Sequence, residues 1–259
     1  PTPAVLPVVT VPTTSGTGSH VTKVAVLTNR DEDKKSAIVH PNMFPECCIV
    51  DPKLAASMPP SVTASTGFDV FTHAFESYVN VGHSPYVDLI AEKSIELIVE
   101  NLPRAIEDGS DLDARSGMCF ADTLGGMSIA NVGTVLPHAM GQPISGHCPH
   151  VSHGESLAVV YPAFFRYTWP AAVERFARVG RILNPELEQE DDRTAAEKSC
   201  EEMEKFLDSI GMLTSLDELD VPEDEMEGIL DHCMEFPDLE ANPKVPDRDK
   251  VAEMFQECR

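Results

Sequence analysis

The sequence predicts a mainly α-helical chain that opens with a short strand-rich segment. Phe68, Phe71, Phe75 and Tyr78 recur at the three- and four-residue spacing of a single helix face. Prolines at positions 59, 60, 85, 103, 137, 170, 222 and 246 supply start and stop signals for helices over the rest of the chain. Short β-branched runs occur before residue 52. We therefore expect strands first and helices afterwards.

The opening segment predicts short strands over 8–11, 24–27, 37–39 and 48–50, the last closed by Asp51 and Pro52. The change from predicted strands to predicted helices places a domain boundary near residue 52, with units 1–52 and 53–259. Some fifty residues of strand do not make a self-sufficient domain. The strands either lie on the helical body or belong to a sheet whose other strands are missing, and the second interpretation is favoured.

The remainder of the chain predicts helices over 61–79, 86–102, 112–131, 171–183, 194–210, 223–235 and 249–258. The third of these is rich in small residues, including Ala114, Gly117, Ala121 and Gly125. We expect that helix to pack closely against a neighbour. No internal repeat or low-complexity stretch is evident.

Composition narrows the class of protein. The 259 residues are 42% hydrophobic and 24% charged, which is typical of a globular protein of one or two domains. No secretory signal or transmembrane run is apparent, so no membrane role is expected. A net charge of -24 argues against nucleic acid as a partner, because phosphate binding needs a basic surface. The seven cysteines lack disulfide or CxxC spacing, which favours a reducing, cytoplasmic setting.

Asp69 and His73 lie four residues apart in the segment STGFDVFTHAFE, so they share one face of the predicted helix. That geometry suits a metal ion, and it equally suits an ordinary hydrogen-bonded pair. A second cluster of histidines downstream favours the metal. Its members are His138, His147, His150 and His153.

A second informative stretch is the loop TTSGTGS, which follows the first strand. Its hydroxyls and accessible backbone N–H groups are suited to phosphate or ribose oxygens. Loops of this composition are more often plain turns, and this one matches neither the GxGxxG nor the Walker A pattern. Its candidate binding residues are Thr13, Thr14, Gly16, Thr17, Gly18 and Ser19.

Three motifs carry a resemblance. PTTSGTGSHVT, then DPKLAASMPPSVTASTGFDVFTHAFESYV, then LPHAMGQPISG with HVSHGESLAVVYP closely resemble the iron-containing (group III) alcohol dehydrogenase family, whose fold is dehydroquinate-synthase-like. The similarity runs from residue 1 to about 170 and continues more loosely beyond. It implies that the chain is the helical metal-binding C-terminal domain of an α/β plus all-α enzyme, with a short remnant of the N-terminal Rossmann-like sheet.

The resemblance implies that Asp69, His73, His138 and His153 bind one divalent metal. A carboxylate with three imidazoles suits Fe²⁺ or Zn²⁺. Such an ion can act as a Lewis acid while hydride moves to or from NAD or NADP. The TTSGTGS loop is similar to the family's nucleotide-contacting segment, and Lys35 matches its cofactor-binding lysine, with Lys34 as the alternative.

The chain departs from the family pattern in two places. Gln142 stands where many members have a second histidine, so His147 or His150 is a candidate for the catalytic proton relay, or for a ligand, because glutamine does not titrate near neutrality. The GGGS-type pyrophosphate turn of the family is not found in this sequence. We therefore expect a fragment that is inactive alone.

The predicted function is that of an NAD(P)-dependent, metal-dependent dehydrogenase acting on a small alcohol or aldehyde, with a homo-oligomer expected. Three alternatives stay open: a hydroxyacid-oxoacid transhydrogenase of the same family, suggested by PISG at 143–146; a dehydroquinate-synthase-like lyase; and an inert metal-binding fragment. The two enzyme alternatives call for a basic substrate pocket, and Lys and Arg are scarce near the site.

Overall fold

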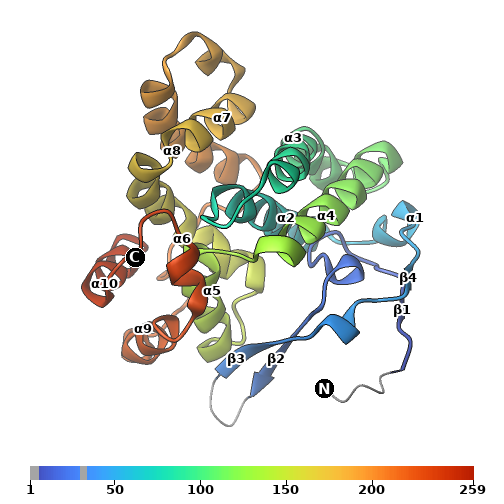
Figure 1. Cartoon of the computed structure of the whole chain (residues 1–259), viewed down its shortest axis with the longest axis horizontal. Helices are drawn as coiled ribbons and strands as arrows, with labels where there is room; N and C mark the ends of the chain where they lie inside the picture. The colour runs from blue at the N-terminus through green and yellow to red at the C-terminus, as the bar shows by residue number, and fades with distance from the viewer. Residues whose placement is uncertain (1–5, 30–33) are drawn as a thin grey trace.

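The computed structural model describes residues 6–29 and 34–259, and the prediction of a mainly α chain is confirmed (Figure 1). The strands are β1 (Val9–Thr10), β2 (Val24–Asn29), β3 (Lys34–Val39) and β4 (Cys47–Cys48). The helices are α1 (Pro52–Ala55), α2 (Pro60–Val79), α3 (Pro85–Glu107), α4 (Leu112–Val132), α5 (Leu136–His147), α6 (His153–Thr168), α7 (Val173–Leu183), α8 (Asp192–Ser209), α9 (Met226–Cys233) and α10 (Arg248–Glu257).

All seven expected helices form, with shifted ends, and two further long helices were missed. Helices α5 and α6 fill the interval between residues 132 and 171, for which we expected no helix. The interval contains three prolines, which in sequence are typical of a loop: Pro137 and Pro143 in α5 and Pro162 in α6. Pro137 is harmless because it lies in the first turn, where its missing N–H would have no intrahelical partner.

The strands form two small sheets. β1 pairs with β4 in parallel, and β2 pairs with β3 as an antiparallel hairpin with Val24 opposite Val39. β3 lies against α5, and the 3-10 turn η1 (Ser19–Val21) lies against α4. β3 therefore rests on the helical body, and the favoured expectation that the strands belong to a sheet whose other strands are missing stays a prediction. The division at residue 52 stays a prediction.

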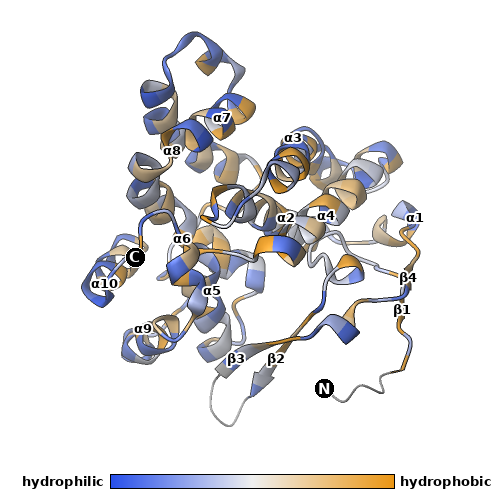
Figure 2. Cartoon of the chain, viewed as in Figure 1, coloured by the Kyte–Doolittle hydropathy of each residue, from blue (hydrophilic) through white to orange (hydrophobic). Residues whose placement is uncertain are grey.

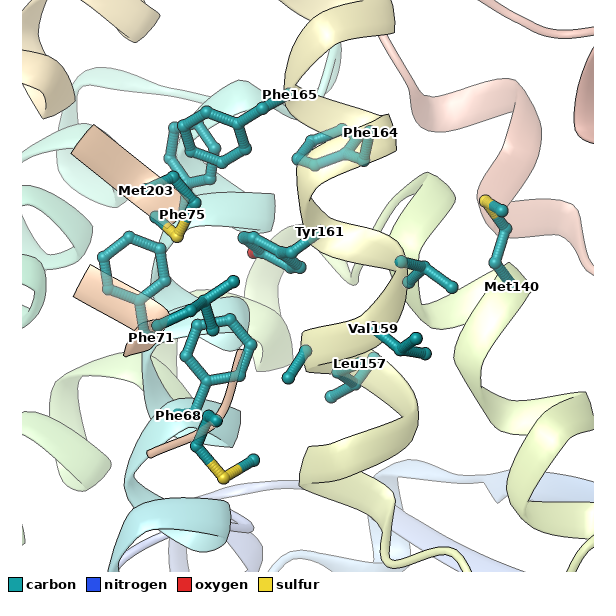
Figure 3. Close-up of a cluster of buried hydrophobic side chains, with 14 of the residues drawn as sticks. Phe68, Phe71, Phe75, Met140, Leu157, Val159, Tyr161, Phe164, Phe165 and Met203 are labelled. Atoms are coloured by element: carbon teal, nitrogen blue, oxygen red, sulfur yellow. The ribbon is translucent and has the colours of Figure 1, made fainter. Parts of the chain in front are cut away.

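Helix α2 runs through the centre of the helical body, in contact with α3, α4 and α6 (Figure 1). Its Phe68, Phe71 and Phe75 are fully buried and pack around Tyr161 of α6, as Figure 3 shows. Ring centroids of Phe68 and Tyr161 are 5.1 Å apart in an edge-to-face arrangement, which suits the aromatic quadrupoles. This aromatic core fixes α2 against α6.

The strand segment is far less covered. Leu6, Val9, Leu27, Val39 and Ile49 each expose more than half of their surface, and Figure 2 shows hydrophobic residues along both strand pairs. Among the described residues, no helix has the length and apolar character needed for a membrane span. All seven cysteines are free thiols, and the reducing cytoplasmic setting stays a prediction.

Candidate metal centre

Three helices bring the four predicted ligands to one point. Asp69 and His73 lie one turn apart on α2, His138 comes from α5, and His153 comes from α6. The Nε2 atoms of His73, His138 and His153 lie 3.5, 3.9 and 3.6 Å from the same oxygen, Asp69 Oδ1. The ligand atoms of Asp69, His73 and His138 all lie within 4.8 Å of one another. A single ion fits between these donors.

Local sequence explains where the two later histidines stand. Ser152 and Glu155 form a reciprocal capping box that begins α6 at His153. Gly154 allows the start of α6 to approach α2, because a Cβ on Gly154 would lie only 2.1 Å from the Ser65 carbonyl oxygen. α5 begins at Leu136, and Pro137 and His138 follow in its first turn, where a proline is tolerated.

Glu76 supports the centre from behind, and sequence reasoning gave it no role. Its Oε1 lies 2.8 Å from His138 Nδ1, and its Oε2 accepts from the Val135 backbone N–H at 2.8 Å. A carboxylate that accepts from Nδ1–H leaves Nε2 free to bind a metal, which is the usual support for a ligating histidine. The sequence feature that could have identified this role is the position of Glu76, three residues after His73 and therefore on the same side of the helix.

Burial sets the charge state of the imidazoles. Burial lowers the pKa of His73 well below its ordinary value, with His138 adding to the effect and the Gly16 backbone opposing it. Burial also lowers the pKa of His153, to about 3. For His138, burial acts to lower the pKa, but the Glu76 carboxylate outweighs it and the pKa is raised. His73 and His153 are thus neutral, as metal binding requires.

The donor set fits a metal on chemical grounds. One hard carboxylate and three imidazoles suit Fe²⁺ or Zn²⁺ better than Ca²⁺, which prefers oxygen ligands. Nδ1 of His153 and Oε1 of Gln142 are buried with no hydrogen-bond partner among the described residues. Polar groups left unpaired in this way are uncommon in folded proteins and indicate that the region is built around a ligand.

The predicted cofactor loop packs onto α4. The Gly18 N–H donates to Asp122 Oδ1 at 2.9 Å, and Ser15 Oγ lies 3.3 Å from Cys119 Sγ. Thr13, Thr17 and Ser19 are exposed, Thr14 is half-buried, and the backbone of Gly16 and Gly18 is covered. Asp122 was not predicted. The sequence signal that could have identified it is a carboxylate among small residues such as Ala121 and Gly125, on a helix face that is expected to be buried.

Lys35 extends from β3 toward the centre. Its Nζ donates to Ser145 Oγ on α5 at 3.1 Å. Burial lowers the pKa of Lys35, and the Asp69 carboxylate acts in the opposite direction. The ammonium therefore lies within electrostatic reach of the predicted ligand Asp69. The side chain of the alternative, Lys34, lies outside the described residues.

The candidate relay histidines are paired elsewhere. His147 Nδ1 lies 2.9 Å from Glu225 Oε2 near the start of α9, and His150 Nε2 lies 3.0 Å from the Leu219 carbonyl oxygen. Gln142 lies one turn after His138 on α5, which puts it on the ligand side of that helix. The catalytic roles of Gln142, His147 and His150 stay predictions, and this geometry favours Gln142 over the two histidines.

Comparison with known proteins settles the family. The family "Iron-containing alcohol dehydrogenase" matches residues 1–52, and "Fe-containing alcohol dehydrogenase family, C-terminal" matches residues 63–258. The chain belongs to the iron-containing alcohol dehydrogenase family. The resemblance seen in the three motifs is thereby confirmed.

Individual relatives support the same family assignment. Long-chain-alcohol dehydrogenase 1 of Geobacillus thermodenitrificans is 36% identical over 93% of this chain and 60% of its own length. NAD-dependent methanol dehydrogenase of Bacillus methanolicus is 31% identical over 97% of this chain and 66% of its own length. The crystal structure of an archaeal halo-thermophilic Red Sea brine pool alcohol dehydrogenase superposes with a TM-score of 0.93 at 36% identity, covering 98% of this chain and 64% of that one. The chain thus spans about three fifths to two thirds of these relatives.

Proposed function

We propose that this chain carries the metal-binding part of an NAD(P)-dependent alcohol dehydrogenase that interconverts a small alcohol and its aldehyde. The observation that carries the proposal is the approach of three imidazole Nε2 atoms to one oxygen of Asp69. A divalent ion bound there supplies a Lewis acid for the substrate oxygen. Fe²⁺ is favoured by the family name and Zn²⁺ is the alternative.

The residues of the chain have separate tasks in this proposal. Asp69, His73, His138 and His153 hold the ion, and Glu76 fixes the tautomer of His138. The exposed hydroxyls of Thr13, Thr17 and Ser19 meet oxygens of NAD or NADP. Lys35, whose ammonium is held at Ser145 within electrostatic reach of Asp69, neutralises negative charge on a bound cofactor or substrate. Gln142 orients a substrate hydroxyl through its unpaired Oε1.

The proposal is tested on the purified 259-residue chain. Metal content after loading with Fe²⁺ or Zn²⁺ should be about one ion per chain, because a site of four protein ligands holds a single ion. Hydride transfer is then followed at the cofactor absorbance with NAD, NADP and a series of primary alcohols and diols. Metal binding that persists when all four ligands are replaced together would contradict the assignment, whatever the activity.

A second candidate reaction is hydride exchange between a hydroxyacid and an oxoacid. It is favoured by the Lys35 Nζ to Ser145 Oγ hydrogen bond, which places an ammonium against the PISG segment, where a substrate carboxylate could pair with it. Comparing small hydroxyacids with alcohols of equal length separates the two reactions. A Lys35→Met variant that loses only the hydroxyacid reaction would favour the second.

We also infer self-association. β2 has β3 on one side, while its other edge has no strand partner among the described residues, and Leu27 on it is 57% exposed. Such an edge is a template for pairing with a second copy. Light scattering of the purified chain measures this, and a monomer at all concentrations would contradict it.

A further inference from the structure

The polar contacts between the cofactor loop and α4 follow one stripe of that helix. Cys119, Asp122, Thr123 and Gly126 recur at three- and four-residue spacing, so they lie on one face. Each of them meets the loop or the turn that follows it. Ser15 reaches Cys119, Gly18 reaches Asp122 and Gly126, and His20 reaches Thr123. The loop is therefore seated along α4 rather than free above it.

Gly18 is the closest point of this contact. Its φ of 58° lies in the left-handed region, and a Cβ on it would lie 2.5 Å from the Gly126 Cα. Only glycine combines that dihedral angle with so close an approach. The Gly18 N–H therefore points at α4, where Asp122 Oδ1 accepts it.

Asp122 is an unusual acceptor in this setting. It is 2% exposed, and among the described residues no Lys or Arg forms an ion pair with it. His20 Nδ1 lies 3.8 Å from Asp122 Oδ2, too far for a hydrogen bond. Thr123 Oγ1 already donates to the Cys119 carbonyl, so it must accept from His20 Nε2–H, which leaves Nδ1 facing the carboxyl without a partner. A buried carboxyl with so little compensation is expensive to keep.

The loop also touches the metal-ligand helix. A Cβ on Gly16 would lie 2.7 Å from Thr66 Cβ on α2, so the Gly16 backbone is packed against that helix. The same backbone lies close enough to His73 and to Asp122 to shift the pKa of both. Residues 16–18 thus form a wedge between α4 and α2, with Asp122 on one side and the ligand His73 on the other.

We propose that Asp122 is the positioning residue of the Thr13 to Ser19 loop: it fixes the Gly18 backbone on α4 and thereby holds Gly16 beside the ligand helix α2. The loop's exposed hydroxyls are then presented in one arrangement, instead of being ordered only on ligand binding. That these hydroxyls meet a nicotinamide cofactor rests on the proposed function. The attachment of the loop by Asp122 does not.

Hydrogen exchange on the whole chain tests the attachment without any cofactor. In Asp122→Leu the acceptor is lost, and we expect amides 15–20 to exchange at least tenfold faster while those of α2 and α4 keep their wild-type rates. Asp122→Asn retains a neutral acceptor oxygen, so the exchange rates of its loop amides should fall between those of the wild type and of Asp122→Leu. Ser128→Ala is the matched control, since it removes a buried polar group of α4 whose hydrogen bond goes to Leu124 within the helix. Wild-type loop protection in Asp122→Leu would overturn the proposal.

Two further measurements keep the test decisive. If Asp122→Leu does not fold, the Gly18 amide of Asp122→Ala, which also lacks the acceptor, is compared with the wild type; at least threefold faster exchange supports the proposal, and equal rates overturn it. NADH fluorescence titration then addresses the cofactor separately. If the wild type binds NADH, Asp122→Leu should bind at least tenfold more weakly and Ser128→Ala equally well, and an unchanged Asp122→Leu overturns the positioning role. If the wild type binds none, the cofactor proposal fails and the exchange rates alone decide on Asp122.

Discussion

Helix α2 and the β2–β3 hairpin place their apolar side chains in opposite environments. Phe71 and Phe75 on α2 are fully buried, whereas Leu27 on β2 is 57% exposed and Ile38 on β3 is 44% exposed. The helical body therefore covers its own core, while the strand segment is held by a few contacts of the loop, η1 and β3 with the helices. The four predicted metal ligands therefore all lie within the helical body, whereas the predicted cofactor loop belongs to the less covered segment that is attached to it.

The largest effect is expected from removing the candidate metal ligands. Replacing Asp69, His73, His138 and His153 together by Ala should abolish binding of the divalent ion, whose free energy in four-ligand sites is on the order of 10 kcal/mol. Replacing His153 alone should weaken binding about 100-fold, because one ligand of four carries roughly a quarter of that energy. Calorimetric titration measures both. His150→Ala serves as the control, and a loss of metal there would mean that His153 has been misassigned.

A second prediction concerns packing in the two regions. Phe75→Ala should lower the free energy of unfolding by about 4 kcal/mol, as large-to-small changes of a fully buried aromatic do. Leu27→Ser should change it by less than about 0.5 kcal/mol, since the side chain is already mostly in water. Urea unfolding of the purified variants decides this. Comparable losses would show that the hairpin is as well buried in solution as the body.

A third prediction uses pH. Burial raises the pKa of Asp122 to about 7, while the Gly18 and Gly16 backbones act to lower it and Asp69 acts to raise it. Because the folded value exceeds that of the unfolded chain, the carboxyl stabilises the fold below about pH 4 relative to neutral pH, and this stability is lost as pH rises through 7. Asp122→Asn should therefore gain up to about 4 kcal/mol over the wild type at pH 8 and nothing near pH 4.

The measurement is urea unfolding of both proteins between pH 4 and 8. The difference between them isolates Asp122 from the other groups of the chain, apart from His20, Cys119 and Asp69, which interact with it electrostatically. A difference that does not vary with pH would mean that Asp122 is ionised throughout.

The smallest expected effect is at Glu76. Glu76→Gln keeps an acceptor for the Val135 N–H but loses the carboxylate that orients His138, so metal affinity should fall roughly 10-fold to 100-fold while the ligands stay in place. Competition with a chelator measures it. Glu204→Gln, which alters an exposed ion pair with Arg166 near the opposite end of α6 from His153, is the matched control. Equal affinities in Glu76→Gln and wild type would show that His138 needs no such support.

Sequence reasoning reached some parts of this structure and missed others for definable reasons. Asp69 and His73 were found from helical spacing, because both lie on one continuous element. His138 and His153 came only from the family resemblance, since prolines and glycines hid α5 and α6. The wider set of ligands could not be derived from spacing, because it depends on how three helices pack.

The two supporting carboxylates show the same limit. Glu76 and Asp122 are ordinary helix residues in a sequence pattern, and their roles appear only when a partner from another element arrives, His138 for Glu76 and Gly18 for Asp122. A charged residue on an otherwise small or apolar helix stripe is the general signal. It predicts burial, and it does not say what the residue will hold.

The exposures around the cluster differ from one side to the other. The side chains of Asp69, His73 and His138 are 8%, 7% and 4% exposed, whereas that of His153 is 28% exposed. Every residue over 67–79 of α2 is buried, so the floor of the site is closed. A solute therefore reaches the cluster past His153, which makes that imidazole the first ligand an arriving ion meets and the last that a departing ion leaves. The lifetime of a bound ion should then follow the motion of the first turn of α6 and be insensitive to the breathing of α2.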